Sequence, residues 1–414
     1  MRSLRCFFSA LIAAFALISV GWAADAARRS FDFSTDPGTF TPERGYGFDL
    51  GTKPGPDGNP FFFSVAVPEG NYRVTVTFGS AKAGSVNTLK AESRQLMIEY
   101  AATRSGEFAT RSFLVNVRNS RVPPPEKNAP GGSVVALNDR ETGLLRWDDK
   151  LTLEFNGTAP QVAAITIERV EVPTVFLIGD STVTDQSYEP GASWGQMLPR
   201  FLPVVAVANH AESGETMKSF ISGLRLAKVL SQIKAGDYLF IQFGHNDEKK
   251  NWPQTYVEAH TTYKAYLKAF IAEARLRDVT PVLITPMQRR NFDSQGKVRN
   301  THGDYPQAVR EVAAEEKVAL IDLERMSVAF YEALGPEKSP LAFSAGGKDV
   351  THHNNYGAYE LAKGIVQGIR DAQLPLAKFI AEDFTPFDPA HPDSPEKFSL
   401  PASPLRSNVA PRGN

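Results

Sequence analysis

A serine, a histidine and an aspartate stand where a serine-dependent acyl transfer would need them. Ser181 follows an apolar run in the segment Gly-Asp-Ser-Thr, and Asp349 precedes His352 by three residues in Asp-Val-Thr-His. A serine hydroxyl is a poor nucleophile at neutral pH unless a base takes its proton. His352 is the predicted base, and one turn of chain can place the Asp349 carboxylate against the other ring nitrogen.

The oxyanion formed in such a reaction needs hydrogen-bond donors. Two further segments supply candidates: Asn-His-Ala-Glu-Ser-Gly ends at Gly214, and Gly-His-Asn-Asp contains Asn246. We expect the backbone N–H groups of Ser181 and Gly214 and the side-chain amide of Asn246 to form an oxyanion hole.

Each motif also has a plainer interpretation when it is taken alone. The serine segment could cap a helix, the asparagine segment could be a turn, and the Asp-x-x-His pair could be a cap or part of a metal site. His353 competes with His352 as the base. A larger metal site is a further alternative, but it would leave the serine and the asparagine without a role. Its ligands would be His210, His245, His352 and Asp349.

The elements that must position these residues lie in the second half of the chain. Continuous apolar runs, typical of strands buried on both faces of a parallel sheet, lie at 175–178, 204–208, 238–243, 282–285 and 318–321. Helical patterns separate or follow them, at 223–233, 256–277, 305–316 and 356–370. The alternation predicts a three-layer α/β/α fold of the flavodoxin-like type, whose strand ends carry the site. We expect Ser181 to be exposed at a strand tip, with a helix N-terminus just beyond it.

Residues 31–171 have a different period. Apolar and polar residues alternate over 72–78, and similar short runs recur up to residue 168. Many alternating strands without a helical pattern predict an antiparallel β-sandwich. The proline- and glycine-rich stretch 123–132 predicts a long surface loop within it. Aromatic residues of this half could stack on sugar rings or fill the core, for example Tyr46, Phe48 and Trp147.

The beginning of the chain has the pattern of an export signal. Arg2 and Arg5 precede an apolar run and then small residues, and the run is shorter than the ~20 residues that a spanning helix needs. We expect a cleaved signal peptide over 1–26 and a secreted or periplasmic protein. The expected domains are a β-sandwich over 28–171 and a catalytic domain over 173–383. The proline-rich tail, 384–414, would wrap the surface or be disordered.

Composition narrows the function classes. The 45 Lys and Arg residues balance the 46 Asp and Glu residues, for a net charge of -1. This balance argues against nucleic acid as a partner and against an anionic membrane as a partner of the mature chain. The single cysteine, Cys6, lies in the expected signal peptide, which excludes a thiol nucleophile from the mature chain. All seven histidines follow residue 209, so acid–base chemistry is expected in the second half.

Together and in this order, the four segments resemble the signature blocks of the GDSL/SGNH hydrolases. The resemblance implies a Ser181–His352–Asp349 triad with the oxyanion hole named above, selects His352 over His353, and implies neither a metal nor an organic cofactor. The Gly-x-Ser-x-Gly elbow of the α/β-hydrolases is absent around Ser181. One departure is Glu215, where many members have an arginine after the glycine.

Within that group, Gly-Asp-Ser-Thr-Val and Gly-His-Asn-Asp resemble the rhamnogalacturonan acetylesterases, and the β-sandwich resembles the galactose-binding-like domain of bacterial members. The implied function is removal of acetyl groups from an acetylated pectic polysaccharide. Two alternatives stay open: an SGNH esterase or lipase for xylan acetyl, aryl or lipid esters, and a non-catalytic glycan-binding protein. Possible substrate contacts are His245, Asp180, Trp194 and His353.

Overall fold

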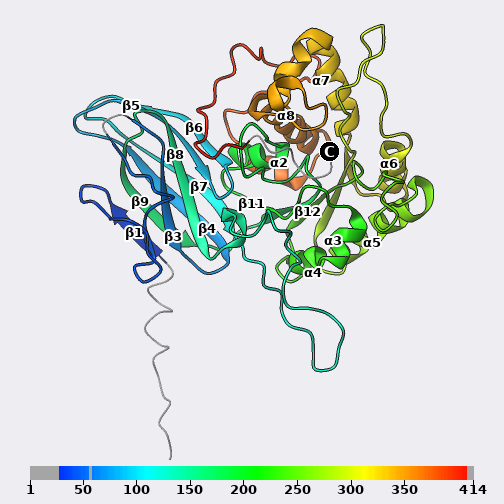
Figure 1. Cartoon of the computed structure of the whole chain (residues 1–414), viewed down its shortest axis with the longest axis horizontal. Helices are drawn as coiled ribbons and strands as arrows, with labels where there is room; N and C mark the ends of the chain where they lie inside the picture. Colours follow the sequence, from blue (N-terminus) through cyan, green and yellow to red (C-terminus); the bar gives the residue numbers. More distant parts are fainter. Residues whose placement is uncertain (1–27, 56–57, 408–414) are drawn as a thin grey trace, which may run out of the picture.

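The computed structural model describes residues 28–55 and 58–407. The expected export signal, residues 1–26, lies outside them. Figure 1 shows a stack of antiparallel strands on one side of the molecule and a layered arrangement of strands and helices on the other. The connection between the two parts lies between β9, which ends at Arg169, and β10, which begins at Thr174.

The first half folds into two antiparallel sheets. One has the strand order β1-β9-β4-β7 and the other the order β2-β3-β8-β5-β6. The bounds in the first sheet are β1 (Arg28–Asp32), β4 (Gly70–Gly79), β7 (Phe108–Val117) and β9 (Val162–Arg169). Those in the second are β2 (Tyr46–Asp49), β3 (Phe61–Ala66), β5 (Ser85–Ala91), β6 (Gln95–Thr103) and β8 (Lys150–Thr158).

The period-two pattern explains the packing of these sheets. In β4, Tyr72, Val74, Val76 and Phe78 are buried, because alternate side chains of a strand point to one face. They meet aromatic residues of the second sheet, where the rings of Phe61 and Phe155 stack with centroids 4.9 Å apart. The antiparallel sandwich predicted from the alternation is confirmed.

The second half contains a parallel sheet with the strand order β11-β10-β12-β13-β14. Its strands are β10 (Thr174–Gly179), β11 (Ala206–Asn209), β12 (Tyr238–Gln242), β13 (Thr280–Ile284) and β14 (Ala319–Ile321). In β10, Val175 and Leu177 join one apolar cluster, whereas Phe176 and Ile178 join another on the opposite face. Burial on both faces is the reason why the strands are continuously apolar.

Helices cover both faces of this sheet, which confirms the three-layer prediction (Figure 1). They are α2 (Trp194–Met197), α3 (Met217–Ser222), α4 (Arg225–Leu230), α5 (Lys264–Arg275), α6 (Tyr305–Glu316), α7 (Leu323–Lys338) and α8 (Asn355–Asp371). Short turns of 3-10 helix are η1 (Leu145–Trp147), η2 (Leu198–Phe201), η4 (Ser339–Ala342), η5 (Ala345–Gly347) and η6 (Pro375–Phe379), and a π-helical turn, η3 (Ala259–Tyr263), precedes α5.

The helices differ from the sequence prediction both in their bounds and in their number. Leu224, in the left-handed region at φ 60°, separates α3 from α4, so that helix α4 is shorter than predicted. The segment predicted as helix over 256–277 is helical only from the π turn at Ala259 to Arg275. Helices α2, α3 and α7 were not predicted from the sequence.

The C-terminal tail joins the two halves over the part that the structure describes. Most of the described tail is exposed or half-buried, but Ser403 is buried and donates a 2.8 Å hydrogen bond to Glu154 of β8. The carbonyl of Pro401 accepts a hydrogen bond from Lys90 of β5 at 3.1 Å. In Figure 1 this red segment runs from the helical part to the sandwich strands.

No helix within residues 28–55 and 58–407 is both long enough and apolar enough to span a bilayer.

Candidate active site

The candidate site lies at the carboxyl ends of three adjacent strands. Ser181 follows β10, Gly214 follows β11 and Asn246 follows β12, and β10 lies between the other two in the sheet. The Asp349–His352 segment comes directly before α8. Strand ends are the usual position of ligand sites in open parallel sheets. This sheet order therefore brings together residues that are far apart in the sequence.

Ser181, His352 and Asp349 form a continuous hydrogen-bonded chain. His352 Nε2 lies 2.8 Å from Ser181 Oγ, and His352 Nδ1 lies 2.9 Å from Asp349 Oδ2. The other Asp349 oxygen accepts backbone N–H groups from Thr351 at 2.8 Å and from His352 at 2.9 Å. A carboxylate on Nδ1 favours the tautomer with its proton there, which leaves Nε2 free to take the serine proton.

The electrostatics of Asp349 suit that arrangement. Burial opposes ionisation, but the hydrogen bond and charge of His352 and the backbone N–H groups hold the pKa of Asp349 well below its usual range. The carboxylate is therefore ionised near neutral pH and can stabilise an imidazolium at His352.

Ser181 is held by a turn instead of by a helix. The N–H groups of Val183 and Thr184 both donate to the Asp180 carbonyl at 3.1 Å, and the first helical residue after the serine is Trp194. Ser181 is 4% exposed. The expectations of an exposed serine and of a helix N-terminus beside it are therefore wrong, and the helix dipole contributes nothing to charge stabilisation at this point.

Each predicted oxyanion donor has an N–H group that can still donate a hydrogen bond. Within the described residues, the backbone N–H groups of Ser181 and Gly214 donate to no other group. Asn246 Nδ2 donates to the Glu215 carbonyl at 3.0 Å, which uses one of its two hydrogens. Lys249 Nζ donates to Asn246 Oδ1 at 3.1 Å and so orients the amide. Three N–H groups can therefore serve a developing oxyanion.

Glu215, the departure from the family pattern, does not place its charge in the site. Its carboxylate lies 3.2 Å from Arg225 Nε and accepts a 2.6 Å hydrogen bond from Ser219 Oγ. The Glu215 carboxylate thus pairs on the α3–α4 side with Arg225, which also pairs with Glu141.

Two predicted substrate contacts, Asp180 and His245, lie buried beneath the serine turn. Asp180 Oδ1 accepts hydrogen bonds from Thr182 N at 2.9 Å and Thr182 Oγ1 at 2.8 Å. His245 Nδ1 lies 3.4 Å from Asp180 Oδ2, and its ring contacts the ring of His302, with centroids 4.5 Å apart. Burial lowers the pKa of His245 to about 4, although the Asp180 carboxylate opposes this shift. These two residues support the turn from below.

Trp194 and His353 belong to the core. Trp194 is 1% exposed and its indole N–H donates to Gln242 Oε1 at 2.9 Å. His353 Nε2 lies 2.8 Å from the Tyr331 hydroxyl, with its ring 4.4 Å from that of Phe343. Neither offers a surface to a substrate, and His353 does not reach Ser181.

The alternative metal site is not assembled. Both ring nitrogens of the buried His210 lack a hydrogen-bond partner within the described part of the chain, and its ring stacks on Phe176 with centroids 5.8 Å apart. Across the described ranges, no group of three or more His, Cys, Asp or Glu side chains is placed to hold a metal ion.

A cavity of about 790 Å³ borders the triad. Asp349, Ser213 and Gln186 line it, and Gln186 Nε2 donates to the Ser181 carbonyl at 2.8 Å. Its wall also includes Arg140 and Arg146, which come from the connection between β7 and β8. Gln186, Arg140 and Arg146 were not predicted from the sequence, because no motif marks them and only the fold brings them to the site.

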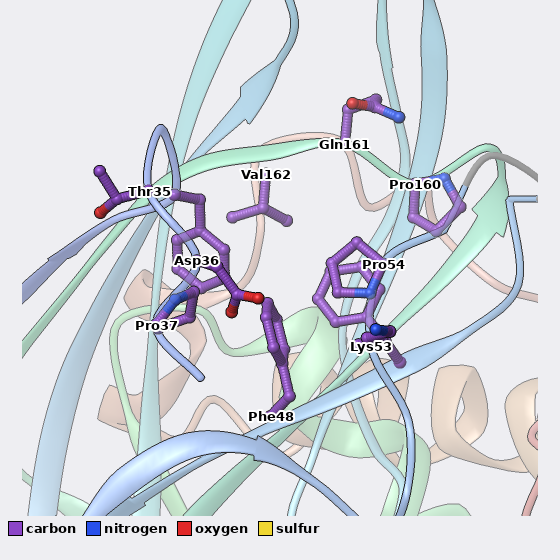
Figure 2. Close-up of a pocket in the computed structure, with 11 residues that line it drawn as sticks. Thr35, Asp36, Pro37, Phe48, Lys53, Pro54, Pro160, Gln161 and Val162 are labelled. Atoms are coloured by element: carbon purple, nitrogen blue, oxygen red, sulfur yellow. The ribbon is translucent and has the colours of Figure 1, made fainter. Parts of the chain in front are cut away.

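A second, smaller cavity of about 340 Å³ lies at one end of the sandwich. Figure 2 shows Phe48, Pro54 and Pro160 around it, and all its lining residues belong to the sandwich. Phe48 is only 7% exposed and belongs to the sandwich core, and Trp147 is 9% exposed. Core packing is therefore the main role of both rings.

Comparisons with known proteins match this half of the chain. The model of the GDSL-like Lipase/Acylhydrolase family matches residues 177–361. The probable rhamnogalacturonan acetylesterase YesY of Bacillus subtilis (strain 168) is 42% identical over 215 residues, which are 50% of this chain and 98% of that protein. This chain belongs to the GDSL-like lipase/acylhydrolase family. As a member of the family, it is a carboxylic ester hydrolase.

Two further proteins of Bacillus subtilis (strain 168) are similar to this GDSL-like hydrolase. The rhamnogalacturonan acetylesterase RhgT is 40% identical over 216 residues, 49% of this chain and 91% of that protein. The uncharacterized esterase YxiM is 28% identical over 316 residues, 74% of each chain. The match to YxiM is longer than the α/β half alone, so it extends into the sandwich.

Proposed function

We propose that this GDSL-like hydrolase is an exported serine esterase that removes acetyl groups from an acetylated pectic polysaccharide, rhamnogalacturonan. The observation that carries the reaction type is the pair of hydrogen bonds that links Asp349 through His352 to Ser181. The substrate class is supported by two relatives that are named as rhamnogalacturonan acetylesterases. The near closure of Ser181, at 4% exposure, favours a small acyl group over a long chain.

Acylation follows from the geometry. Ser181 Oγ attacks the acetyl carbonyl carbon while its proton passes to His352 Nε2, which is 2.8 Å away. The Asp349 carboxylate stabilises the imidazolium that forms. Negative charge develops on the carbonyl oxygen, and the N–H groups of Ser181, Gly214 and Asn246 are the donors that stabilise it.

The same histidine completes acylation as an acid and begins deacylation as a base. His352 gives its proton to the sugar oxygen as the ester C–O bond breaks, which releases the glycan hydroxyl and leaves acetyl-Ser181. Water then gives a proton to His352 and attacks the acyl carbon. Ser181 Oγ leaves, takes the proton back, and acetate is released. The chain's own residues supply every group in this sequence, without a metal or an organic cofactor.

The first prediction concerns the nucleophile. Ser181→Ala removes the attacking oxygen, so acetate release from acetylated rhamnogalacturonan should fall to background while the urea-unfolding midpoint stays unchanged. Ser222→Ala, at an exposed serine of α3, is the matched control and should keep full activity. Activity of Ser181→Ala comparable with wild type would refute the assignment.

Substrate class is tested by parallel assays on acetylated rhamnogalacturonan, acetylated xylan and an octanoyl ester. We expect the highest kcat/KM on the first. A higher value on xylan would identify a different glycan, and a higher value on the octanoyl ester would identify a lipase.

Export is supported by the charged, apolar and small residues of 1–26. Sequencing the N-terminus of the protein recovered from the periplasm or medium should show cleavage near residues 23–26. An N-terminus that still begins at Met1 would contradict cleavage.

A further inference from the structure

The cavity beside the triad is built by five separate segments of the chain. The β7–β8 connection supplies Arg140 and Leu144, and the loop after β11 supplies Glu212 and Ser213. The segment after Ser181 supplies seven residues between Thr184 and Gly191. The segment before α8 supplies Ser344 to Asp349, and the C-terminal tail supplies Arg406 and Ser407. The β7–β8 connection and the C-terminal tail belong to none of the sequence motifs. The catalytic motifs alone therefore do not define the wall of this cavity.

The charges that reach solvent in this cavity are positive. Lys348 and Arg406 are exposed, and the Arg140 side chain is 34% exposed. Neither Lys348 nor Arg406 forms an ion pair with any residue that the structure describes. Arg140 is held in place by Glu212 Oε1 at 2.6 Å and by the Ser213 carbonyl at 2.6 Å.

The acidic residues of the lining are already engaged. Asp185 is buried and accepts hydrogen bonds from Asn209 and Gln95, both at 2.8 Å. Glu212 is buried between Arg140 and Arg146. Asp349 is hydrogen-bonded to His352. A ligand that enters the cavity therefore meets unpaired cations but no unpaired carboxylate.

The remaining wall suits a sugar ring. Tyr188 is 46% exposed and lines the cavity with Pro190 and Leu144. A pocket that combines apolar surface with a few charged groups binds a ring through its C–H face and fixes its orientation through its charged substituent. The volume of about 790 Å³ is within the usual range for ligand sites.

We propose that this cavity is a subsite for the carboxylate of a uronic acid residue in the glycan, with Arg406 and Lys348 as its charged partners. Arginine presents paired donors to a carboxylate, and lysine adds a point charge. Because Asp349 and Ser213 lie in the same wall, a carboxylate bound there lies close to the acetyl group that meets Ser181. This inference rests on the proposed function, since it names the acidic sugar that the esterase recognises.

The kinetic test uses Arg406→Gln, Lys348→Gln and the double variant. The substrates are acetylated rhamnogalacturonan with free uronates and the same polymer with its uronates methyl-esterified. We expect the double variant to raise KM for the free form about tenfold. This factor should be at least five times larger than the increase in KM for the esterified form. Added salt should raise the wild-type KM for the free form, because exposed charges are screened.

Arg111→Gln is the matched control, since Arg111 is an exposed residue of β7 that does not line the cavity. It should leave both KM values unchanged. Equal KM increases of the double variant on the free and the esterified polymer would overturn the subsite.

A binding experiment separates this subsite from the proposed reaction. Calorimetry of full-length Ser181→Ala with deacetylated rhamnogalacturonan oligosaccharides needs no turnover. Binding that weakens about tenfold in Ser181→Ala/Arg406→Gln/Lys348→Gln supports the subsite, even if acetate release on pectic substrates fails. Equal affinity of Ser181→Ala for neutral xylo-oligosaccharides would overturn it.

Discussion

At the scale of single residues, the triad depends on two side chains that lie 171 positions apart, Ser181 and His352. Each is oriented by a local device: the serine by the turn at Asp180, and the histidine by the Asp349 carboxylate with its two backbone N–H bonds. Glycine is required at position 179, because a Cβ there would come within 2.4 Å of the Gln242 carbonyl oxygen. Such local requirements explain why this site leaves short motifs in the sequence.

The Asn246 side chain is expected to stabilise the oxyanion. Asn246→Ala removes the remaining amide N–H from the developing charge, so kcat should fall by ~10²–10³. Steady-state kinetics on an acetyl ester measures the effect. A loss smaller than threefold would remove Asn246 from the hole.

His353 is expected to make the folding stability depend on pH. Burial lowers its pKa to about 3, whereas an unfolded histidine titrates near ~6.5. The unfolded state therefore binds the proton first as pH falls below ~6.5, and stability is lost. Between pH 7.5 and 5.5, the free energy of unfolding of wild type should fall by about 1.4 kcal/mol more than that of His353→Gln. Parallel curves from urea titrations at each pH would contradict it.

At the scale of elements, the connection between β7 and β8 is more than the surface loop predicted from its prolines and glycines. Residues 123–130 are exposed, and in Figure 1 the teal loop projects below the sheets. Its later part returns to the α/β half, where Arg146 donates to Thr184 Oγ1 and to the Asp185 carbonyl, both at 2.7 Å. The sandwich thereby positions the segment that follows Ser181.

The contact between Arg146 and the α/β half is expected to contribute to the folding stability. Arg146 pairs with Glu212, and the side chains are 4% and 2% exposed. Arg146→Met leaves Glu212 with less charge compensation, so the free energy of unfolding should fall by about 3–5 kcal/mol. Chemical unfolding measures this, and the double variant Arg146→Met/Glu212→Leu should regain part of the loss.

Arg325→Met is the surface control, because its pair with Asp322 is 3.3 Å long and the Arg325 side chain is 74% exposed. It should cost less than about 1 kcal/mol. A cost for Arg146→Met as small as that of Arg325→Met would show that the pair does not tie the sandwich to the site.

At the scale of the whole molecule, a buried polar face holds the two halves together. Lys90 and Glu154 of the sandwich pair at 3.3 Å with 2% of each side chain exposed, and Lys90 lies 3.6 Å from Glu189 of the α/β half. The tail completes this face, because Ser403 donates to Glu154 through Oγ and to Glu189 through its N–H. Buried charges need such partners.

Ser403→Ala is the prediction at this scale. It leaves Glu154 short of one buried donor, so the protein should lose about 1–3 kcal/mol of unfolding free energy. Thermal and urea unfolding check the value, with the exposed Ser222→Ala as the control. An effect no larger than that of the control would mean that the tail only covers the surface.

Local patterns in the chain predict the fold class and single out Ser181, His352 and Asp349. Period-two and continuous apolar patterns follow from which faces of a strand are buried, and the strand-end rule places Ser181, Gly214 and Asn246 together. Contacts between distant segments, by contrast, bury Ser181 almost completely and place Trp194 and His353 in the core. They also pair Glu215 with Arg225. The same kind of contact brings Arg140 and Arg406 to one cavity. The reason is physical: local patterns report burial and turns, whereas these contacts arise where distant segments meet.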